Sequence, residues 1–206
     1  MGLHQGVTAR FSLLTTIDHV PDTWLVRFTL GVVALMKAEQ KIVAVGAASG
    51  VVAMALSVWL LTTVLPIPEI ADTLAERLAY ALRANIVAIV PFFVMIITVG
   101  NSRFLSEAID PTRRAESRSM EIDGRVADNT LQQTFVFAIA SLSLSTIVPL
   151  HHLQVIWACA IVFVIARAAF WLGYRLNPLY RAPGMSATGY MNLGMILYLL
   201  FHMFVR

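Results

Sequence analysis

The chain has 206 residues, of which 58% are hydrophobic and only 13% are charged, and its formal net charge is +3. The hydrophobic residues come in long blocks between polar connections, a pattern that excludes an ordinary water-soluble fold. The basic residues are spread over short connections instead of forming one tract with aromatic residues, so no nucleic-acid partner is expected.

The first part of the chain is expected to hold an interfacial segment and one membrane-spanning helix. Arg27 interrupts the apolar stretch 24–36, which we interpret as a helix that lies in the membrane interface because it is too short between charges to cross a bilayer. Residues 42–65 carry no charge and are long enough to span the hydrocarbon core. Gly46 and Gly50 in this span form either a packing face for a second helix or a chance pair with no special role.

Four further hydrophobic segments are each long enough to cross a membrane. Pro91 lies inside the first of them and is expected to kink it, because proline lacks the N–H that would bond to the preceding turn. The four segments are residues 78–100, 131–150, 153–174 and about 185–205. We therefore predict an all-α integral membrane protein in which residues 1–41 form a cytoplasmic or interfacial segment, 42–65 an additional transmembrane helix and 78–206 a four-helix domain.

The distribution of lysine and arginine indicates how the spans are oriented. With the N-terminus in the cytoplasm, most of the basic residues in the connections lie on the inner side. This predicts a multi-pass protein with a cytoplasmic N-terminus, in the plasma or inner membrane if the source is bacterial. Within the inner loop, the segment 110–114, DPTRR, is typical of a turn with a solvated charge cluster, and contact with anionic lipid is the alternative.

Polar residues mark one face of the helix that enters the third span. Arg125, Asn129 and Gln132 are spaced i, i+4 and i+7, which places them on the same side of a helix. Arg167 lies within the fourth span, where a guanidinium is unfavourable unless it faces the bundle interior, a polar partner or a water-filled cavity.

The antiparallel order of the spans gathers polar side chains at the inner side of the membrane. The residues expected at a similar depth there are Arg103, Arg125, Asn129, Gln132, Tyr174 and Arg181. Several cations and hydrogen-bonding groups in one place suit a small polyanionic ligand that enters beside a lipid-exposed cleft. The alternative is that these arginines only anchor helix ends and mark the topology.

Neither a disulfide nor a metal site is expected. Cys159 is the only cysteine, so any sulfur chemistry must use a thiol brought from outside the chain. His151 and His152 are adjacent, and neighbouring side chains of a helix point about 100° apart, so a shared metal ion is not expected.

Two stretches resemble the signatures of the MAPEG family, the membrane-associated proteins in eicosanoid and glutathione metabolism. Residues 125–133, RVADNTLQQ, resemble the family's R-x-x-x-N-x-x-E signature. Residues 167–181, RAAFWLGYRLNPLYR, resemble the other signature, with its helix tyrosine and following arginine. The resemblance covers about residues 78–206 and leaves the first span as an additional helix. It implies a four-helix unit, usually a homotrimer, that binds glutathione at the cytoplasmic side between subunits.

The resemblance also implies an activity and roles for individual residues. It indicates a glutathione-dependent transferase or peroxidase that acts on apolar electrophiles or lipid hydroperoxides supplied by the membrane. A guanidinium beside the glutathione thiol favours the reactive thiolate. Glutathione would be a co-substrate held by Arg125, Asn129 and Gln132 and contacted by Tyr174, with Arg181 as the thiol-activating residue and Arg103 as a further candidate.

Two departures from the family pattern leave a second function open. Gln132 stands where the family usually has glutamate, and Phe170 occupies a position that is often tyrosine or histidine. Each change is expected to weaken glutathione binding by about 1–3 kcal/mol if the lost partner is buried. The family also includes a non-enzymatic member that presents lipid to another enzyme. The alternatives are therefore a non-catalytic lipid-binding or scaffold protein of the same fold and, after it, a small transporter or sensor.

Overall fold

The computed structural model describes residues 37–113 and 115–205, so the interfacial helix predicted for residues 24–36 lies outside the described residues. Residues 42–206 form one compact unit, and residues 1–41 form another, of which only the last five are described. Five helices are long and apolar enough to cross a membrane, in agreement with the five predicted spans. They are α3 (Ala38–Val64), α4 (Leu74–Phe104), α5 (Arg118–Ile147), α6 (Val155–Leu176) and α7 (Ala182–Val205).

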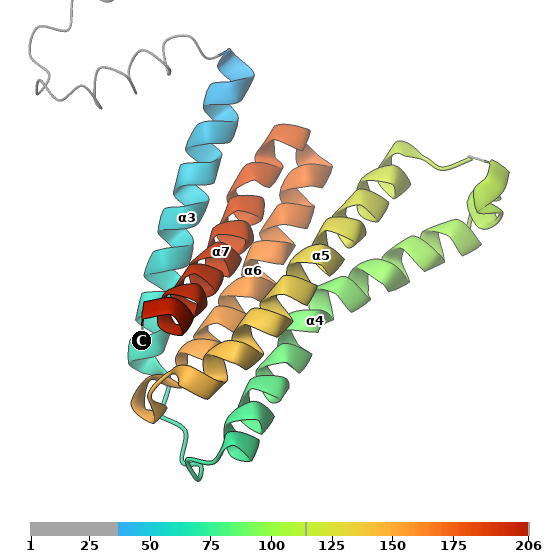
Figure 1. Ribbon diagram of the computed structural model, residues 1–206. Coiled ribbons are helices and arrows are strands. Elements are labelled where there is room, and N and C mark those ends of the chain that lie inside the picture. The colour runs from blue at the N-terminus through green and yellow to red at the C-terminus, as the bar shows by residue number, and fades with distance from the viewer. Residues whose placement is uncertain (1–36, 114, 206) are drawn as a thin grey trace, which may run out of the picture. The chain divides into compact units, whose positions relative to one another are not determined.

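Within the unit formed by residues 42–206, successive helices run in opposite directions (Figure 1). The connections α4–α5 and α6–α7 therefore lie at the same end of the bundle, which we call the arginine end (residues 105–117 and 177–181). The connections α3–α4 and α5–α6 meet at the other, the histidine end (residues 65–73 and 148–154). This arrangement brings the polar residues of α5, α6 and α7 to the same end.

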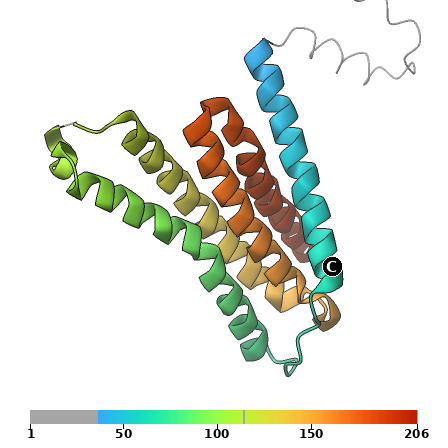
Figure 2. The ribbon, with the colours of Figure 1, turned by 180° about the vertical axis from the view of Figure 1, so that it is seen from behind.

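Two helices differ from the expected spans in ways that have clear causes. α5 begins at Arg118, well before the expected start at residue 131, because the Ser117 side chain accepts a hydrogen bond from Met120 N (3.4 Å) and caps a polar first half. Pro91 lies near the middle of α4, and the ribbon of α4 bends about halfway along its length (Figure 2). The kink expected from proline is thus present, although the helix continues through it.

The α4–α5 connection contains the expected turn. It consists of two short 3-10 helices, η1 (Glu107–Ile109) and η2 (Pro111–Arg113). Asp110 Oδ1 accepts hydrogen bonds from Thr112 N (2.9 Å) and Thr112 Oγ1 (2.6 Å), and these bonds hold the pKa of Asp110 below its ordinary value. The turn is an Asx-type structure stabilised by its own polar side chains.

The contact between α3 and α7 is built on glycine. A β-carbon at Gly50 would lie 2.1 Å from Pro183 O and 2.6 Å from Ser186 Oγ, so the two backbones touch directly. Ser186 Oγ donates a hydrogen bond to Ala47 O at 2.9 Å. In a membrane the hydrophobic effect does not drive helices together, so helix association relies on close packing. Small residues allow the backbones to approach this closely. Of the two interpretations of Gly46 and Gly50, the packing face is confirmed.

Substitution of Gly50 with alanine is expected to destabilise the protein, although alanine is the better helix former by about 1 kcal/mol. The added methyl group overlaps a backbone carbonyl, and overpacking of this kind costs about 1–3 kcal/mol. Gly189 is the matched control, because a β-carbon there meets nothing within 4 Å. Thermal unfolding in detergent should show a lower melting temperature for Gly50→Ala and an equal or higher one for Gly189→Ala. Equal behaviour of the two variants contradicts the close contact.

Candidate functional site

The arginine end is built from the ends of α4, α5, α6 and α7. The 3-10 helix η4 (Pro178–Arg181) joins α6 to α7. Asn177 starts η4, because its Oδ1 accepts a hydrogen bond from Leu179 N (2.9 Å) after α6 has ended. Proline at the following position fixes the backbone and cannot continue α6. The chain therefore turns sharply and returns toward the helix it has just left.

This turn brings Arg181 onto Tyr174. A β-carbon at Gly173 would lie 2.4 Å from Tyr180 O, so the returning backbone passes directly over a residue that has no side chain. The Arg181 guanidinium carbon then lies 5.0 Å from the centroid of the Tyr174 ring. Tyr174 is buried, whereas Arg181 is exposed. Two residues selected from the sequence are thus in contact, and the guanidinium remains open to a ligand.

Arg125, Asn129 and Gln132 share one side of α5, but their surroundings differ. Arg125 and Gln132 are exposed, and within the described part of the chain neither side chain has a hydrogen-bonding partner. Asn129 is half-buried, and its Oδ1 accepts a hydrogen bond from Arg167 Nη1 (2.8 Å). Its amide nitrogen is the group left for a ligand. Of the three residues predicted to share one side of α5, Arg125 and Gln132 are therefore open to a ligand, whereas Asn129 is bound to α6.

Arg167 is a wholly buried cation that ties three helices together. Its Nη2 donates to Gly184 O (3.1 Å) and to the Thr188 hydroxyl on α7, while Nη1 reaches Asn129 on α5. Its guanidinium carbon lies 4.6 Å from the centroid of the Phe170 ring. The expectation that this arginine faces interior polar partners is confirmed. Phe170 packs against the arginine, which accounts for a ring without a hydroxyl at this position.

A second group around Asp123 was missed from the sequence. Asp123 is buried, and its carboxylate accepts hydrogen bonds from Trp171 Nε1 (2.7 Å) and from Arg175 Nε (2.9 Å) and Nη2 (2.6 Å). The fork of Arg175 thus binds both carboxylate oxygens and locks the end of α6 to α5. The sequence does contain a signal for this ion pair. Asp123 lies near the start of α5 and Arg175 near the end of α6, and these ends lie together when the two helices are antiparallel.

A polar cavity of about 630 Å³ opens between α5 and α6 at this end. We call it the arginine cavity, and its lining residues are Arg118, Ser119, Ile122, Tyr174, Arg175, Leu176 and Pro178. Two guanidinium groups and two hydroxyl groups around one space suit a ligand that carries carboxylates. The role of Arg118 was also missed, although it precedes Arg125 by seven residues and so lies on the same side of α5.

Arg103 lies apart from this cavity, in the last turn of α4. Its Nη2 donates to Glu116 across the α4–α5 connection, and the two side chains form an ion pair. Arg103 Nε is buried and has no partner within the described residues. The structure thus gives Arg103 a role in holding the connection, and it is not among the residues that line the arginine cavity.

Comparisons with known proteins agree with the signatures in the sequence. The model of the MAPEG family matches residues 78–201. Transmembrane protein 79 of Mus musculus is 26% identical over 133 residues, which are 65% of this chain and 34% of that protein. Transmembrane protein 79 of Bos taurus is 27% identical over 133 residues, or 33% of its length. The chain thus spans about a third of the curated relatives it matches. No solved structure matches it significantly.

Proposed function

The chain belongs to the MAPEG family, and on that premise we propose that it is a membrane-bound, glutathione-dependent transferase or peroxidase acting on apolar electrophiles or lipid hydroperoxides. The observation that carries the proposal is the exposed guanidinium of Arg181 held 5.0 Å from the ring of Tyr174. Tyr174 also lines the arginine cavity, so a ligand in that cavity contacts the residue on which Arg181 rests.

The proposed binding of glutathione uses the charges at this end of the bundle. Glutathione has two carboxylates, and Arg118 and Arg125 on one side of α5 are suited to pair with them. The amide groups of Asn129 and Gln132 add hydrogen bonds beside Arg125. Arg175 contributes less, because Asp123 already occupies its fork. Arg103 is a more distant contributor to the positive field at the same end.

Arg181 is proposed to stabilise the glutathione thiolate. A guanidinium lowers the thiol pKa and so raises the fraction of the nucleophilic form near neutral pH. In conjugation, the sulfur electron pair forms a bond to carbon, the leaving group departs with its own pair, and the thiol proton passes to solvent. In peroxide reduction, the thiolate attacks one peroxide oxygen, the O–O bond breaks to give the lipid alcohol, and a second glutathione reduces the resulting sulfenic acid to the disulfide and water.

A homotrimer with its arginine end in the cytoplasm is part of the proposal. Arg125 and Gln132 are exposed on the side of α5, where a neighbouring subunit would cover them and complete the site. The excess of arginine at this end favours the cytoplasmic side. Membrane lipid then supplies the apolar co-substrate directly to the site.

The test is addition of glutathione to the purified protein in detergent. Thiolate absorbance and conjugation of a generic aromatic electrophile are measured for the wild type and for Arg181→Ala. We expect a thiolate signal and conjugation that depend on Arg181. Absence of a thiolate signal, with no difference between the two proteins, contradicts a catalytic function.

Gln132→Glu is expected to strengthen glutathione binding about 5- to 30-fold, the equivalent of about 1–2 kcal/mol. A carboxylate there can pair with the ammonium group of glutathione, which a neutral amide does not. Gln133→Glu is the matched control, because Gln133 faces α7 and its Oε1 accepts a hydrogen bond from Asn192 Nδ2 (2.9 Å). Isothermal titration of both variants checks the prediction, and equal or weaker binding by Gln132→Glu contradicts it.

A non-catalytic lipid-binding or scaffold function is the second candidate. It is favoured by the neutral Gln132 and by Asn129, whose amide oxygen is already used by Arg167. A site with fewer groups for glutathione would bind it weakly or not at all. Failure of both glutathione binding and conjugation in the experiment above, with the protein folded, favours this candidate.

A further inference from the structure

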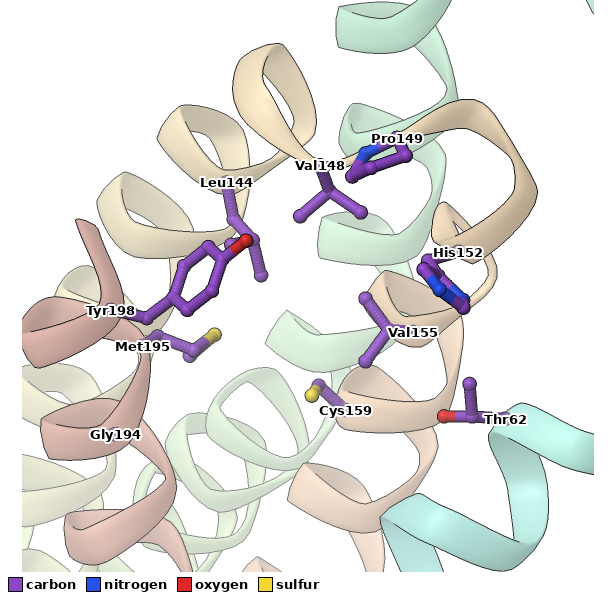
Figure 3. Close-up of a pocket in the computed structure, with 10 residues that line it drawn as sticks. All are labelled: Thr62, Leu144, Val148, Pro149, His152, Val155, Cys159, Gly194, Met195 and Tyr198. Carbon is purple, nitrogen blue, oxygen red and sulfur yellow. The ribbon is translucent and has the colours of Figure 1, made fainter. Parts of the chain in front are cut away.

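A second cavity, of about 390 Å³, lies at the histidine end of the bundle between α3, α5, α6 and α7 (Figure 3). Its volume is near the lower end of the range of about 300–1,000 Å³ typical of small-molecule sites. Leu144, on its wall, is about 22 Å farther along α5 than Asn129, at about 1.5 Å per residue. This cavity is therefore separate from the arginine cavity and from the proposed thiol site.

The wall of this cavity is mainly apolar. The side chains of Leu144, Val148, Val155 and Met195 surround one central space, and the Cys159 thiol lies at its lower edge (Figure 3). Among the described lining residues there is no aspartate, glutamate, lysine or arginine. An apolar chain fits such a space, whereas a charged group inside it would lose its hydration without gaining a partner.

Arg77, a cation near this wall, is already bound to the protein. Its Nη1 donates to the carbonyl oxygens of Val148 (2.6 Å) and Ser145 (3.0 Å), and its Nε pairs with Asp72 (2.6 Å). These bonds satisfy the carbonyl groups at the C-terminal end of α5. An anionic ligand therefore gains little at this end, and a neutral one is favoured.

Hydrogen-bonding groups lie at the rim. His152 is exposed, and the Tyr198 ring points toward Leu144 (Figure 3). Gln154 is 6% exposed, and its Nε2 donates to the carbonyl oxygen of Thr62, a lining residue, at 3.4 Å. Gln154 Oε1 is buried with no partner within the described residues. Gln154 is not among the lining residues, so the imidazole of His152 and the hydroxyl of Tyr198 are the groups available to a polar head in the cavity.

We propose that the histidine-end cavity binds a neutral lipid with one apolar chain and an uncharged hydroxyl-bearing head, of which a monoacylglycerol is the model. The four helices that form it are each long enough to span a membrane, so the cavity opens where lipid is the solvent. The chain lies against the apolar wall, and the head lies at the rim with His152 and Tyr198. This site does not depend on glutathione or on Arg181.

The test uses a monoacylglycerol with a photoactivatable diazirine in its chain and the full-length protein in lipid nanodiscs. Gly194→Phe fills the cavity, because Gly194 lines it and a β-carbon there meets nothing within 4 Å. Gly189→Phe is the matched control on the same helix, with equally open space and no part in the lining. We expect photolabelling of the cavity wall in the wild type and in Gly189→Phe, and a loss of at least about fivefold in Gly194→Phe.

Two results overturn the proposal. One is labelling spread evenly over the lipid-facing surfaces and unchanged in Gly194→Phe. The other is equal labelling by a diazirine fatty acid, whose head is anionic.

Discussion

Arg181→Ala is expected to lower kcat/KM for glutathione conjugation by about 10²- to 10³-fold, the loss typical of removing one preorganised group that stabilises a developing or reacting anion. The guanidinium is exposed and rests on the ring of Tyr174, so alanine removes the charge without opening a buried space. The fold should therefore survive, and melting temperature in detergent is the check. Arg181→Lys should recover part of the rate, because it restores the charge but not the planar fork.

The pH profile separates loss of thiolate stabilisation from general damage. Without the guanidinium, the pKa of the bound thiol rises toward the ordinary value of about 8.5. The thiolate fraction at neutral pH then falls, so the deficit of Arg181→Ala should be largest below that pH and shrink above it. Arg113→Ala, which changes an exposed arginine of η2 at the same end, should leave the profile unchanged. A deficit that is constant with pH contradicts a role in holding the thiolate.

The helices were largely predictable, because the membrane-spanning part of each is mainly apolar. Residues 42–65 and 153–174 define α3 and α6 to within a few residues, since charge or proline ends each block. The start of α5 was not predictable from hydropathy. The helix begins after the Ser117 cap, and its first turns are polar and precede the apolar region. Hydropathy locates the part of a helix that lipid surrounds, while the cap locates where the helix begins.

The sequence predicts which residues lie at the site better than it predicts which side chains bond to each other. Spacing places Arg125, Asn129 and Gln132 on one side of α5, but only the packed bundle shows that Arg167 takes the Asn129 oxygen. The bond between Arg175 and Asp123 likewise joins residues far apart in the chain. Such pairings depend on the rotation of each helix about its axis, which one sequence does not specify when several faces are apolar.

The additional helix α3 contacts the segment that carries the proposed thiol-activating residue. Gly50 lies against Pro183, two residues after Arg181, and Gly173 lies under Tyr180, one residue before it. Backbone contacts on both sides therefore fix the position of Arg181 more firmly than an exposed turn would. Residues 42–64 of α3, which lie outside the family match over residues 78–201, thus belong to the same compact unit as Arg181.

Arg167→Met is expected to destabilise the protein by about 2–3 kcal/mol. Methionine is apolar and of similar length, so it fills the space but leaves the Asn129 oxygen and the Thr188 hydroxyl without their donor. Loss of hydrogen bonds to a charged group costs about 1.5–3 kcal/mol. The effect stays below the 3–5 kcal/mol of a broken buried ion pair, because Gly184 O still accepts from Thr188 Oγ1 (3.2 Å) and half-buried Asn129 can turn to water.

Thermal unfolding in detergent should show this loss as a fall of about 5–10 °C in melting temperature. Arg83→Met is the matched control, because it removes an exposed arginine from a predicted span and should change the melting temperature little. A double variant, Arg167→Met with Asn129→Leu, removes donor and acceptor together and should be more stable than the sum of the two single effects implies. Strict additivity would show that the bond between Arg167 and Asn129 contributes nothing, and Arg167 would then stabilise the bundle through α7 alone.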